Sequence, residues 1–256
     1  MTRAAFPMKA ACAALFPQGP ALHGIREAAL HGMGRGWVDA PLHPRCAVLT
    51  AGDFLLCGGV PGPSARHLLR HALMSERREW LIGAPEGWTA ALEAVARTET
   101  ATRYAFDPES QPQDAPLAAM VKRLPEGAAL IPLEGPLIAA CRQEPWSRDF
   151  VSQYTDGDYA RRGLGMLLTM DGRAVAGASS YLSYPGGMEV QVQTREGFEG
   201  RGYATIASAG LILLAHERGL RVTWDAANAA SARLAEKLGY RSAGAYAVYV
   251  FQGFRP

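Results

Sequence analysis

The chain has 256 residues, of which 48% are hydrophobic and 20% are charged, the proportions of an ordinary globular protein. Its 26 basic and 24 acidic residues leave a formal charge of +2, so charge gives no reason to expect a nucleic acid or an anionic membrane as a partner. A chain of this length forms one large domain or two small ones, and it can bury a substantial core without disulfides or metals.

The cysteines and the N-terminal residues bear on the cellular location of the protein. The four cysteines are Cys12, Cys46, Cys57 and Cys141. Their spacing matches neither a zinc site nor a disulfide framework, so we expect a reduced, cytoplasmic protein without a bound metal. The apolar run Ala10–Phe16 follows two basic residues but is at the lower limit for the core of a signal peptide. No stretch approaches the ~20 apolar residues of a membrane span.

Residues 1–123 predict a smaller α/β domain, because short apolar runs bounded by turns alternate with helical spacing. The expected elements are a hairpin of Ala47–Thr50 and Asp53–Cys57, a helix over Ala65–Arg78 capped by Ser64, a strand at Trp80–Gly83, a helix over Pro85–Arg97 and a strand at Arg103–Phe106. The polar stretch Asp107–Pro116 then predicts a surface connection.

Residues 124–256 predict a second α/β domain with clearer elements. The expected strands are Ala128–Pro132, Gly165–Met170, Arg173–Tyr181, Met188–Thr194, Arg221–Asp225 and Ala245–Phe251, and the expected helices are Pro136–Arg142, Gly202–Arg218 and Asn228–Leu238. Asp171-Gly172 should join two of these strands, since Asp-Gly favours a two-residue hairpin turn. Gly219 and Gly239 should end the last two helices.

A glycine-rich turn links one of these strands to the long helix. It reads Phe198-Glu199-Gly200-Arg201-Gly202-Tyr203-Ala204. Its small residues allow a ligand to approach the backbone, and the helix that follows offers unpaired N–H groups and the positive end of its dipole. Strand, turn and helix together predict a pyrophosphate site. The turn lacks the Gly-Lys-Ser/Thr ending of a nucleotide P-loop and the glycine spacing of a dinucleotide fold.

This turn resembles that of the GNAT acetyltransferases, which follows the pattern Gln/Arg-x-x-Gly-x-Gly/Ala. The stretch from Asn228 to Tyr240, which ends in Glu-Lys-Leu-Gly-Tyr, is similar to the family's second cofactor element. The resemblance covers residues 124–256 and implies an α/β fold with a mixed central sheet flanked by helices. With the extra N-terminal part, the stretch Trp224–Asn228 is similar to a bacterial subfamily that includes antibiotic self-resistance enzymes. One interpretation is that the N-terminal domain is a degenerate copy of the fold.

The resemblance implies acetyl-CoA as the co-substrate. The backbone of Val192, Gln193 and Thr194 would pair with the pantetheine arm, and Asn228 would contact the cofactor where two central strands separate. The residues whose N–H groups would hold the pyrophosphate are Gly200, Arg201, Gly202, Tyr203, Ala204 and Thr205. Glu199 stands where the family has Gln or Arg, so its side chain is expected to face away from the phosphates.

Direct transfer to an amine requires that the amine lose its proton. Glu189 is the predicted base, because a partly buried carboxylate beside the cofactor can titrate near neutral pH; a solvated strand residue is the equal alternative. Many family members protonate the leaving thiolate with a Tyr seven residues after the Asn, and that position here is Ala235. Ser231 is the predicted substitute, with a capping or packing role as the alternative that its position favours.

The sequence therefore predicts an acetyl-CoA-dependent N-acetyltransferase that acts on a primary amine of a small molecule, with no nucleic acid or membrane partner; a homodimer remains open. The alternatives are an amino-acid N-acyltransferase with another acyl-CoA donor and a non-catalytic acyl-CoA-binding regulator. Trp146, Tyr181 and Tyr184 could line the acceptor pocket. His67 and His71 have the spacing of metal ligands, but neighbouring arginines favour a solvated cationic face.

Overall fold

The computed structural model describes residues 2–3, 12–75 and 79–255, and part of the apolar run Ala10–Phe16 lies outside them. The chain forms two compact units, one of Met1–Ala105 with Gly244–Pro256 and one of Phe106–Ala243. The expected boundary at residues 123 and 124 thus lies inside the second unit. The physical reason is that the helix α5 (Asp114–Val121) packs on α8 (Tyr203–Glu217), while the end of the chain pairs with a strand of the first unit.

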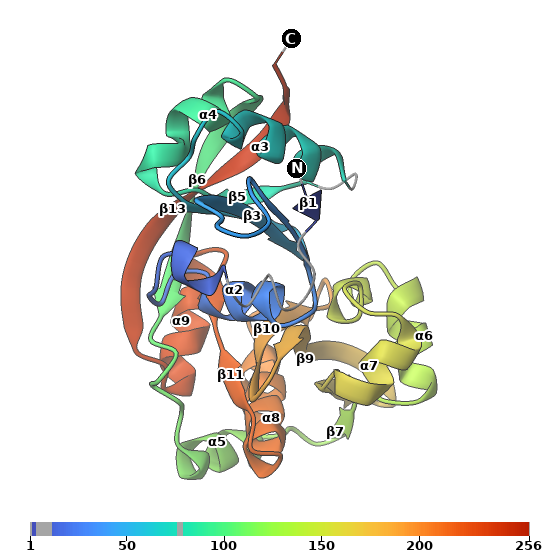
Figure 1. Cartoon of the computed structure of the whole chain (residues 1–256). Coiled ribbons are helices and arrows are strands. Elements are labelled where there is room, and N and C mark those ends of the chain that lie inside the picture. Colours follow the sequence, from blue (N-terminus) through green and yellow to red (C-terminus); the bar gives the residue numbers. More distant parts are fainter. Residues whose placement is uncertain (1, 4–11, 76–78, 256) are drawn as a thin grey trace. The chain divides into compact units, whose positions relative to one another are not determined.

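The first unit is a twisted sheet with helices on both faces (Figure 1). Its strands are β1 (Thr2–Arg3), β2 (Arg35–Val38), β3 (Cys46–Ala51), β4 (Phe54–Gly59), β5 (Leu81–Gly83), β6 (Ala96–Phe106) and β13 (Ser242–Phe254). Its helices are α2 (His23–Leu30), α3 (Ala65–Met74) and α4 (Thr89–Glu93), with short 3-10 turns η1 (Ala13–Leu15) and η2 (Glu86–Trp88). The strand order is β1-β2-β3-β4-β5-β13-β6.

The predicted hairpin of β3 and β4, the strand β5 and the helix α3 are confirmed in the first unit. Ser64 precedes α3, but its side chain makes no capping hydrogen bond. The helix predicted over Pro85–Arg97 is confirmed over residues 86–93, as η2 and α4, but it ends early. Ala96 and Arg97 begin β6, because pairing of Ala96–Phe106 within the sheet overrides the local helical pattern. The helix α2 was not predicted.

The second unit contains a five-stranded sheet of order β11-β10-β9-β8-β7. Its strands are β7 (Ala128–Pro132), β8 (Gly165–Met170), β9 (Arg173–Tyr184), β10 (Gly187–Thr194) and β11 (Arg221–Thr223), and β12 (Asp225–Ala226) follows. Besides α5 and α8 its helices are α6 (Pro136–Gln143), η3 (Arg148–Phe150), α7 (Asp156–Arg162) and α9 (Ala229–Leu238). The pairs are antiparallel except β10 with β11, which are parallel.

The local signals predicted most of the second unit. Asp171 and Gly172 both have positive φ, 49° and 78°, as the predicted hairpin turn requires. Gly219 and Gly239 follow α8 and α9 with positive φ, which confirms the two predicted helix ends. The helices α5 and α7 were not predicted: α5 begins inside the stretch Asp107–Pro116 that was expected to be a surface connection, and α7 begins with a polar first turn that resembles a loop.

The sheet of the second unit is covered on both faces, which explains why β9 is buried along most of its length. Ala176 belongs to the apolar cluster that includes Ile206 and Ala207 of α8. The next residue, Gly177, faces Phe150 of η3, as strand alternation requires. Among the described residues, no helix has both the length and the apolar character needed to cross a membrane.

The two units share one order of strand pairing. In the first, β2, β3 and β4 are antiparallel neighbours, α3 follows, and β5 returns parallel to β4. In the second, β8, β9 and β10 are antiparallel neighbours, α8 follows, and β11 returns parallel to β10. Each parallel pairing spans three residue pairs and then ends.

We predict that Gly210→Leu destabilises the second unit. A Cβ atom at Gly210 of α8 would lie 3.0 Å from Leu130 Cδ1 and 3.3 Å from Met166 Cγ, so the extra side chain has no room above the sheet. Overpacking of this kind costs about 1–3 kcal/mol, which exceeds the gain of up to ~1 kcal/mol from replacing a helical glycine. Thermal unfolding measures the effect, and a variant at least as stable as the parent would contradict the packing described.

Candidate functional site

The predicted glycine turn lies at the start of α8 and faces open space. Gly200 and Gly202 have φ of 73° and 81°, a region that disfavours other residues. A methyl group built on either glycine would meet no other atom within 4 Å. Gly202 is the N-cap of α8 and offers no side chain to the helix, so the first N–H groups of the helix remain available to a ligand.

The side chains of the turn are engaged within the turn itself. The Glu199 carboxylate accepts a hydrogen bond from the N–H of Gly197 at 2.7 Å. Arg201 donates to the carbonyl of Gly197 at 3.0 Å, and its guanidinium lies over the Phe198 ring. The acidic side chain is therefore held by the loop backbone, and Arg201 leaves a positive charge close to the glycines.

β10 and β11 part beside this turn. Their parallel pairing ends at Glu189 with Thr223, and from Val190 to Thr194 β10 pairs only with β9 among the described strands. The strand is buried up to Glu189 and half-buried beyond it. The predicted residues Val192, Gln193 and Thr194 thus belong to a strand segment with one unpaired edge, where another extended group can add to the sheet.

Glu189 lies where the strands part, and it is only 2% exposed. One carboxylate oxygen accepts a hydrogen bond from the N–H of Asp225 and the other from the hydroxyl of Thr223, each at 2.7 Å. A register shift in β10 follows immediately, between Glu189 and Val190. Glu189 is therefore a buried residue that joins β10 to the chain after β11, which the alternative of a solvated strand residue did not foresee.

Further groups extend the contacts of Glu189. The hydroxyl of Tyr184 donates to Thr223 Oγ1 at 3.3 Å, so three residues form a hydrogen-bonded chain. Tyr240 donates to the carbonyl of Val222 at 2.9 Å. Burial, with the nearby charge of Glu189, raises the pKa of Tyr240 well above its ordinary value, so this phenol stays protonated.

Asn228 and Ser231 meet at the start of α9. The side-chain oxygen of Asn228 accepts a hydrogen bond from the N–H of Ser231 at 2.9 Å, so Asn228 is the N-cap of α9. The indole N–H of Trp224 donates to Ser231 Oγ at 3.1 Å. Trp224 is buried against Tyr240, with ring centroids 5.6 Å apart. Ala235 is fully buried, so that position presents no polar group.

Sequence reasoning missed Thr223, Trp224 and Asp225 as site residues. One continuous strand was predicted over Arg221–Asp225, but the structure breaks it after Thr223. Because of this break, the three residues can contact Glu189 and Ser231. Of the aromatic residues proposed for an acceptor pocket, Tyr184 joins the Glu189 chain. Trp146 packs on Phe150, with the Arg195 guanidinium over its ring.

The two histidines on α3, His67 and His71, are both exposed, as the predicted solvated face requires. The His71 ring packs edge-on against Trp37, with centroids 5.5 Å apart. Within residues 12–75 and 79–255, no group of three or more His, Cys, Asp or Glu side chains could hold a metal ion.

Comparison with known proteins finds the same architecture. The family model described as GNAT acetyltransferase matches residues 15–249. A GCN5-related N-acetyltransferase-like protein from Streptococcus suis is 32% identical, with a TM-score of 0.85 over 97% of this chain and 100% of that one. A GCN5-related N-acetyltransferase from Kribbella flavida is 17% identical and has a TM-score of 0.58 over 97% and 99%. These two structures therefore share both units.

A tandem GNAT protein from the clavulanic acid biosynthesis pathway is 16% identical, with a TM-score of 0.55 over 96% of this chain and 92% of that one; at this identity it shows the fold alone. A comparison with curated protein sequences finds no significant match. The family match covers most of the chain, and it includes the glycine turn, the parted strands and the capped helix α9. The chain belongs to the GNAT acetyltransferase family, whose members are acyltransferases.

Proposed function

We propose that this chain is an acetyl-CoA-dependent N-acetyltransferase that transfers the acetyl group directly to a primary amine of a small molecule. The observation that carries the proposal is the open glycine turn at the N-terminus of α8, next to the unpaired edge of β10. The turn offers N–H donors and a helix dipole to an anion, and the edge offers backbone groups to an amide chain. Coenzyme A has a pyrophosphate and an amide-containing arm in that order.

The residues fit this molecule in three places. The N–H groups of residues 200–205 would hold the pyrophosphate, since Gly200 and Gly202 leave the space in front of them open. The edge of β10 at Val192–Thr194 would pair with the pantetheine amides. Asn228 uses its side-chain oxygen for the helix cap, which leaves its NH2 group to contact the arm.

When bound, acetyl-CoA supplies an activated acetyl group, so the protein needs mainly to position the amine and move protons. We assign the proton acceptor to Glu189. Its carboxylate accepts two hydrogen bonds, and an ionised carboxylate is the form that can take up a proton. The carboxylate is buried, and Tyr184 is the most exposed member of its hydrogen-bonded chain at 9% exposure, so the amine proton would reach Glu189 through Tyr184 and Thr223.

Ser231 is assigned to relaying a proton from water to the leaving sulfur, so that its hydroxyl takes a proton from the water as it gives up its own. Its oxygen already accepts a hydrogen bond from Trp224, so its own O–H hydrogen is directed elsewhere. A hydroxyl that accepts a hydrogen bond is polarised and becomes a better donor. Ser231 is half-buried, which lets it reach a bound molecule.

A second candidate is a non-catalytic acyl-CoA-binding regulator, and the buried Ala235 favours it because no Tyr stands there to protonate a thiolate. Turnover separates the two functions. Thiol release from acetyl-CoA is followed with a panel of small primary amines, including amino acids, and the same amines are tested with longer acyl-CoAs. Release that depends on an amine supports the enzyme, whereas tight CoA binding without release on any amine supports the regulator.

We predict that Gly202→Asp weakens CoA binding by about tenfold or more, since it places a negative charge and bulk where phosphate would sit. Gly219→Asp is the matched control. Gly219 has φ of 68° and equally open surroundings, but it lies at the other end of the same helix. Calorimetric titration with CoA should show a loss for the first variant only. Equal affinities for the two variants would place the phosphates elsewhere.

Asn228→Ala should lower stability by about 1 kcal/mol through loss of its helix cap and should also raise the KM for acetyl-CoA. Thr155→Ala removes a similar cap, since Thr155 Oγ1 accepts from the N–H of Asp158 at 3.1 Å. The two variants should therefore unfold at similarly reduced temperatures. If both leave KM unchanged, Asn228 acts only as a cap.

Glu189→Gln separates the catalytic role of Glu189 from its structural one. The amide oxygen can still accept from Asp225, and the amide NH2 can donate to Thr223, whose hydroxyl then donates to the Met188 carbonyl 3.0 Å away. We expect kcat to fall by roughly 10²–10⁴ with little change in unfolding temperature. Glu189→Ala, which loses both hydrogen bonds, should unfold earlier as well. Full activity of Glu189→Gln would limit the residue to a structural role.

A further inference from the structure

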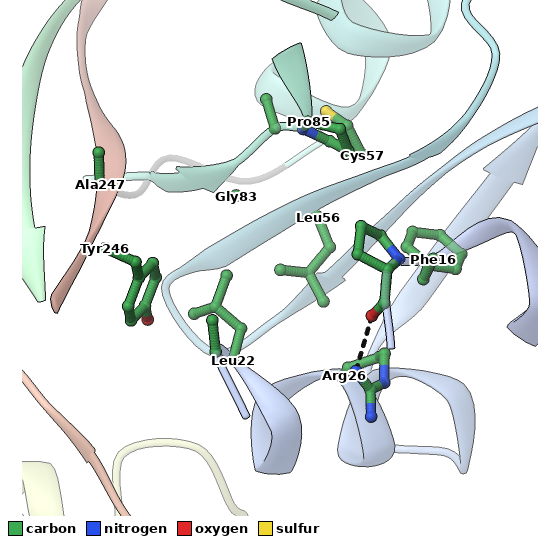
Figure 2. A pocket seen from close by; sticks show the side chains of 12 residues that line it. Phe16, Leu22, Arg26, Leu56, Cys57, Gly83, Pro85, Tyr246 and Ala247 are labelled. Atoms are coloured by element: carbon green, nitrogen blue, oxygen red, sulfur yellow. Dashed lines mark hydrogen bonds between the residues drawn. The ribbon is translucent and has the colours of Figure 1, made fainter. Parts of the chain in front are cut away.

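We propose that the first unit contains a ligand site of its own, which takes a small, uncharged, apolar molecule. The site is a cavity of about 190 Å³ where β4 and β5 part. Its walls include Leu56 and Cys57 of β4, Gly83 at the end of β5 and Tyr246 of β13. In Figure 2, the side chains of Leu22 and Leu56 point toward one another, and Tyr246 lies beside them.

The place of the cavity corresponds to that of the cofactor arm in the second unit. The parallel pairing of β4 with β5 ends at Leu56 with Gly83, after three residue pairs, as that of β10 with β11 ends at Glu189 with Thr223. Parted strands leave a wedge between them that the sheet cannot fill. In the first unit apolar side chains from the N-terminal segment line this wedge, among them Phe16 and Leu22.

The first unit lacks the means to bind a pyrophosphate. After β4 the chain has Pro61 and Pro63, which carry no N–H donor. A Cβ atom on Gly59 would lie 2.1 Å from the carbonyl oxygen of Arg45, so this glycine faces its own backbone and not open space. The N–H of Val60 already donates to that carbonyl at 2.9 Å. The cavity is therefore not a second coenzyme A site.

Arg26, the charged residue in the wall of the cavity, already has hydrogen-bond partners. Arg26 is 5% exposed, and its guanidinium donates to the carbonyl of Pro17 at 2.8 Å and to Glu27 Oε1 at 3.3 Å. This buried charge is paired, so it holds the segment around Pro17 and is not free for an anionic ligand. Burial raises the pKa of the Cys57 thiol, which keeps that wall neutral. An uncharged ligand suits these walls.

A strained residue holds one wall in place. Leu22 is the N-cap of α2 with φ of 56° and ψ of 23°, a left-handed conformation that is an outlier for a bulky side chain. Strain of this kind persists where the surrounding structure fixes it, and it concentrates at ligand sites. Here it directs the Leu22 side chain into the cavity.

The size of the cavity indicates a ligand with one ring. An apolar cavity of about 150 Å³ accommodates benzene in another protein, so 190 Å³ suits a substituted benzene or a short branched chain. Toluene and benzoate are suitable probes because they share the ring and differ in charge.

The test is a ligand-observed NMR titration of the whole protein with toluene and with benzoate. We expect saturable toluene binding and at least tenfold weaker benzoate binding. Ala84→Phe, at the cavity wall, should weaken toluene binding at least tenfold, whereas Ala90→Phe, on the exposed side of α4, should not. The CoA affinity of the Ala84→Phe and Ala90→Phe variants should be unchanged, and Gly202→Asp should leave the toluene affinity unchanged. The failure of this proposal can therefore be told apart from the failure of the proposed function.

Several outcomes would overturn the proposal. Toluene binding that does not saturate, or that survives Ala84→Phe, removes the site. If benzoate binds as tightly as toluene or more tightly, the proposal that the ligand is uncharged is wrong, and Arg26 binds an anionic group. If Ala84→Phe unfolds early, Ala247→Phe blocks the same cavity from β13, and its toluene affinity decides the question.

Discussion

The site of the second unit depends on one buried carboxylate. Glu189 accepts hydrogen bonds from Thr223 and from the N–H of Asp225, and so it fixes the chain beside β10 where the parallel pairing ends. Without that anchor, β11 could continue along β10 and close the edge that an extended ligand needs. A buried charge is costly unless its hydrogen bonds are satisfied, and here both oxygens are. The parting of the strands is therefore built into the fold and does not depend on a ligand.

Two helices of this unit begin in contrasting ways. α9 is capped by the side chain of Asn228, while α8 begins at Gly202, which has no side chain to offer. A glycine at the N-cap forgoes only a few tenths of a kcal/mol relative to a capping side chain, and it leaves the first N–H groups of α8 without a side-chain partner. A bound anion would satisfy these N–H groups and interact favourably with the helix dipole. The open turn itself could be predicted from sequence, because glycines and a following helix determine it locally.

The sequence predicted elements wherever the signal was local, as in the Asp171-Gly172 hairpin, the β7 strand and the glycine ends of α8 and α9. It failed where contacts between distant segments decide. The stretch Pro85–Arg97 has a helical pattern and forms η2 and α4, but its last two residues join a sheet with β13, more than 140 residues away. The hydrogen bonds of Glu189 and the contact of Trp224 with Ser231 depend on the end of β11 at Thr223, which no pattern of residues in the sequence predicts.

The two units show how one strand arrangement can serve two chemistries. Both place a parallel strand beside an antiparallel sheet and end the pairing after three residues. The two units differ in the loop that follows β4 in the first unit and β10 in the second. In the second unit its glycines face open space, and in the first unit Gly59 packs on the carbonyl of Arg45 and two prolines remove donors. Loss of the donors removes any attraction for phosphate, while the wedge between the strands remains. In the first unit the apolar side chains of Phe16 and Leu22 line this wedge, which is why an apolar ligand suits it.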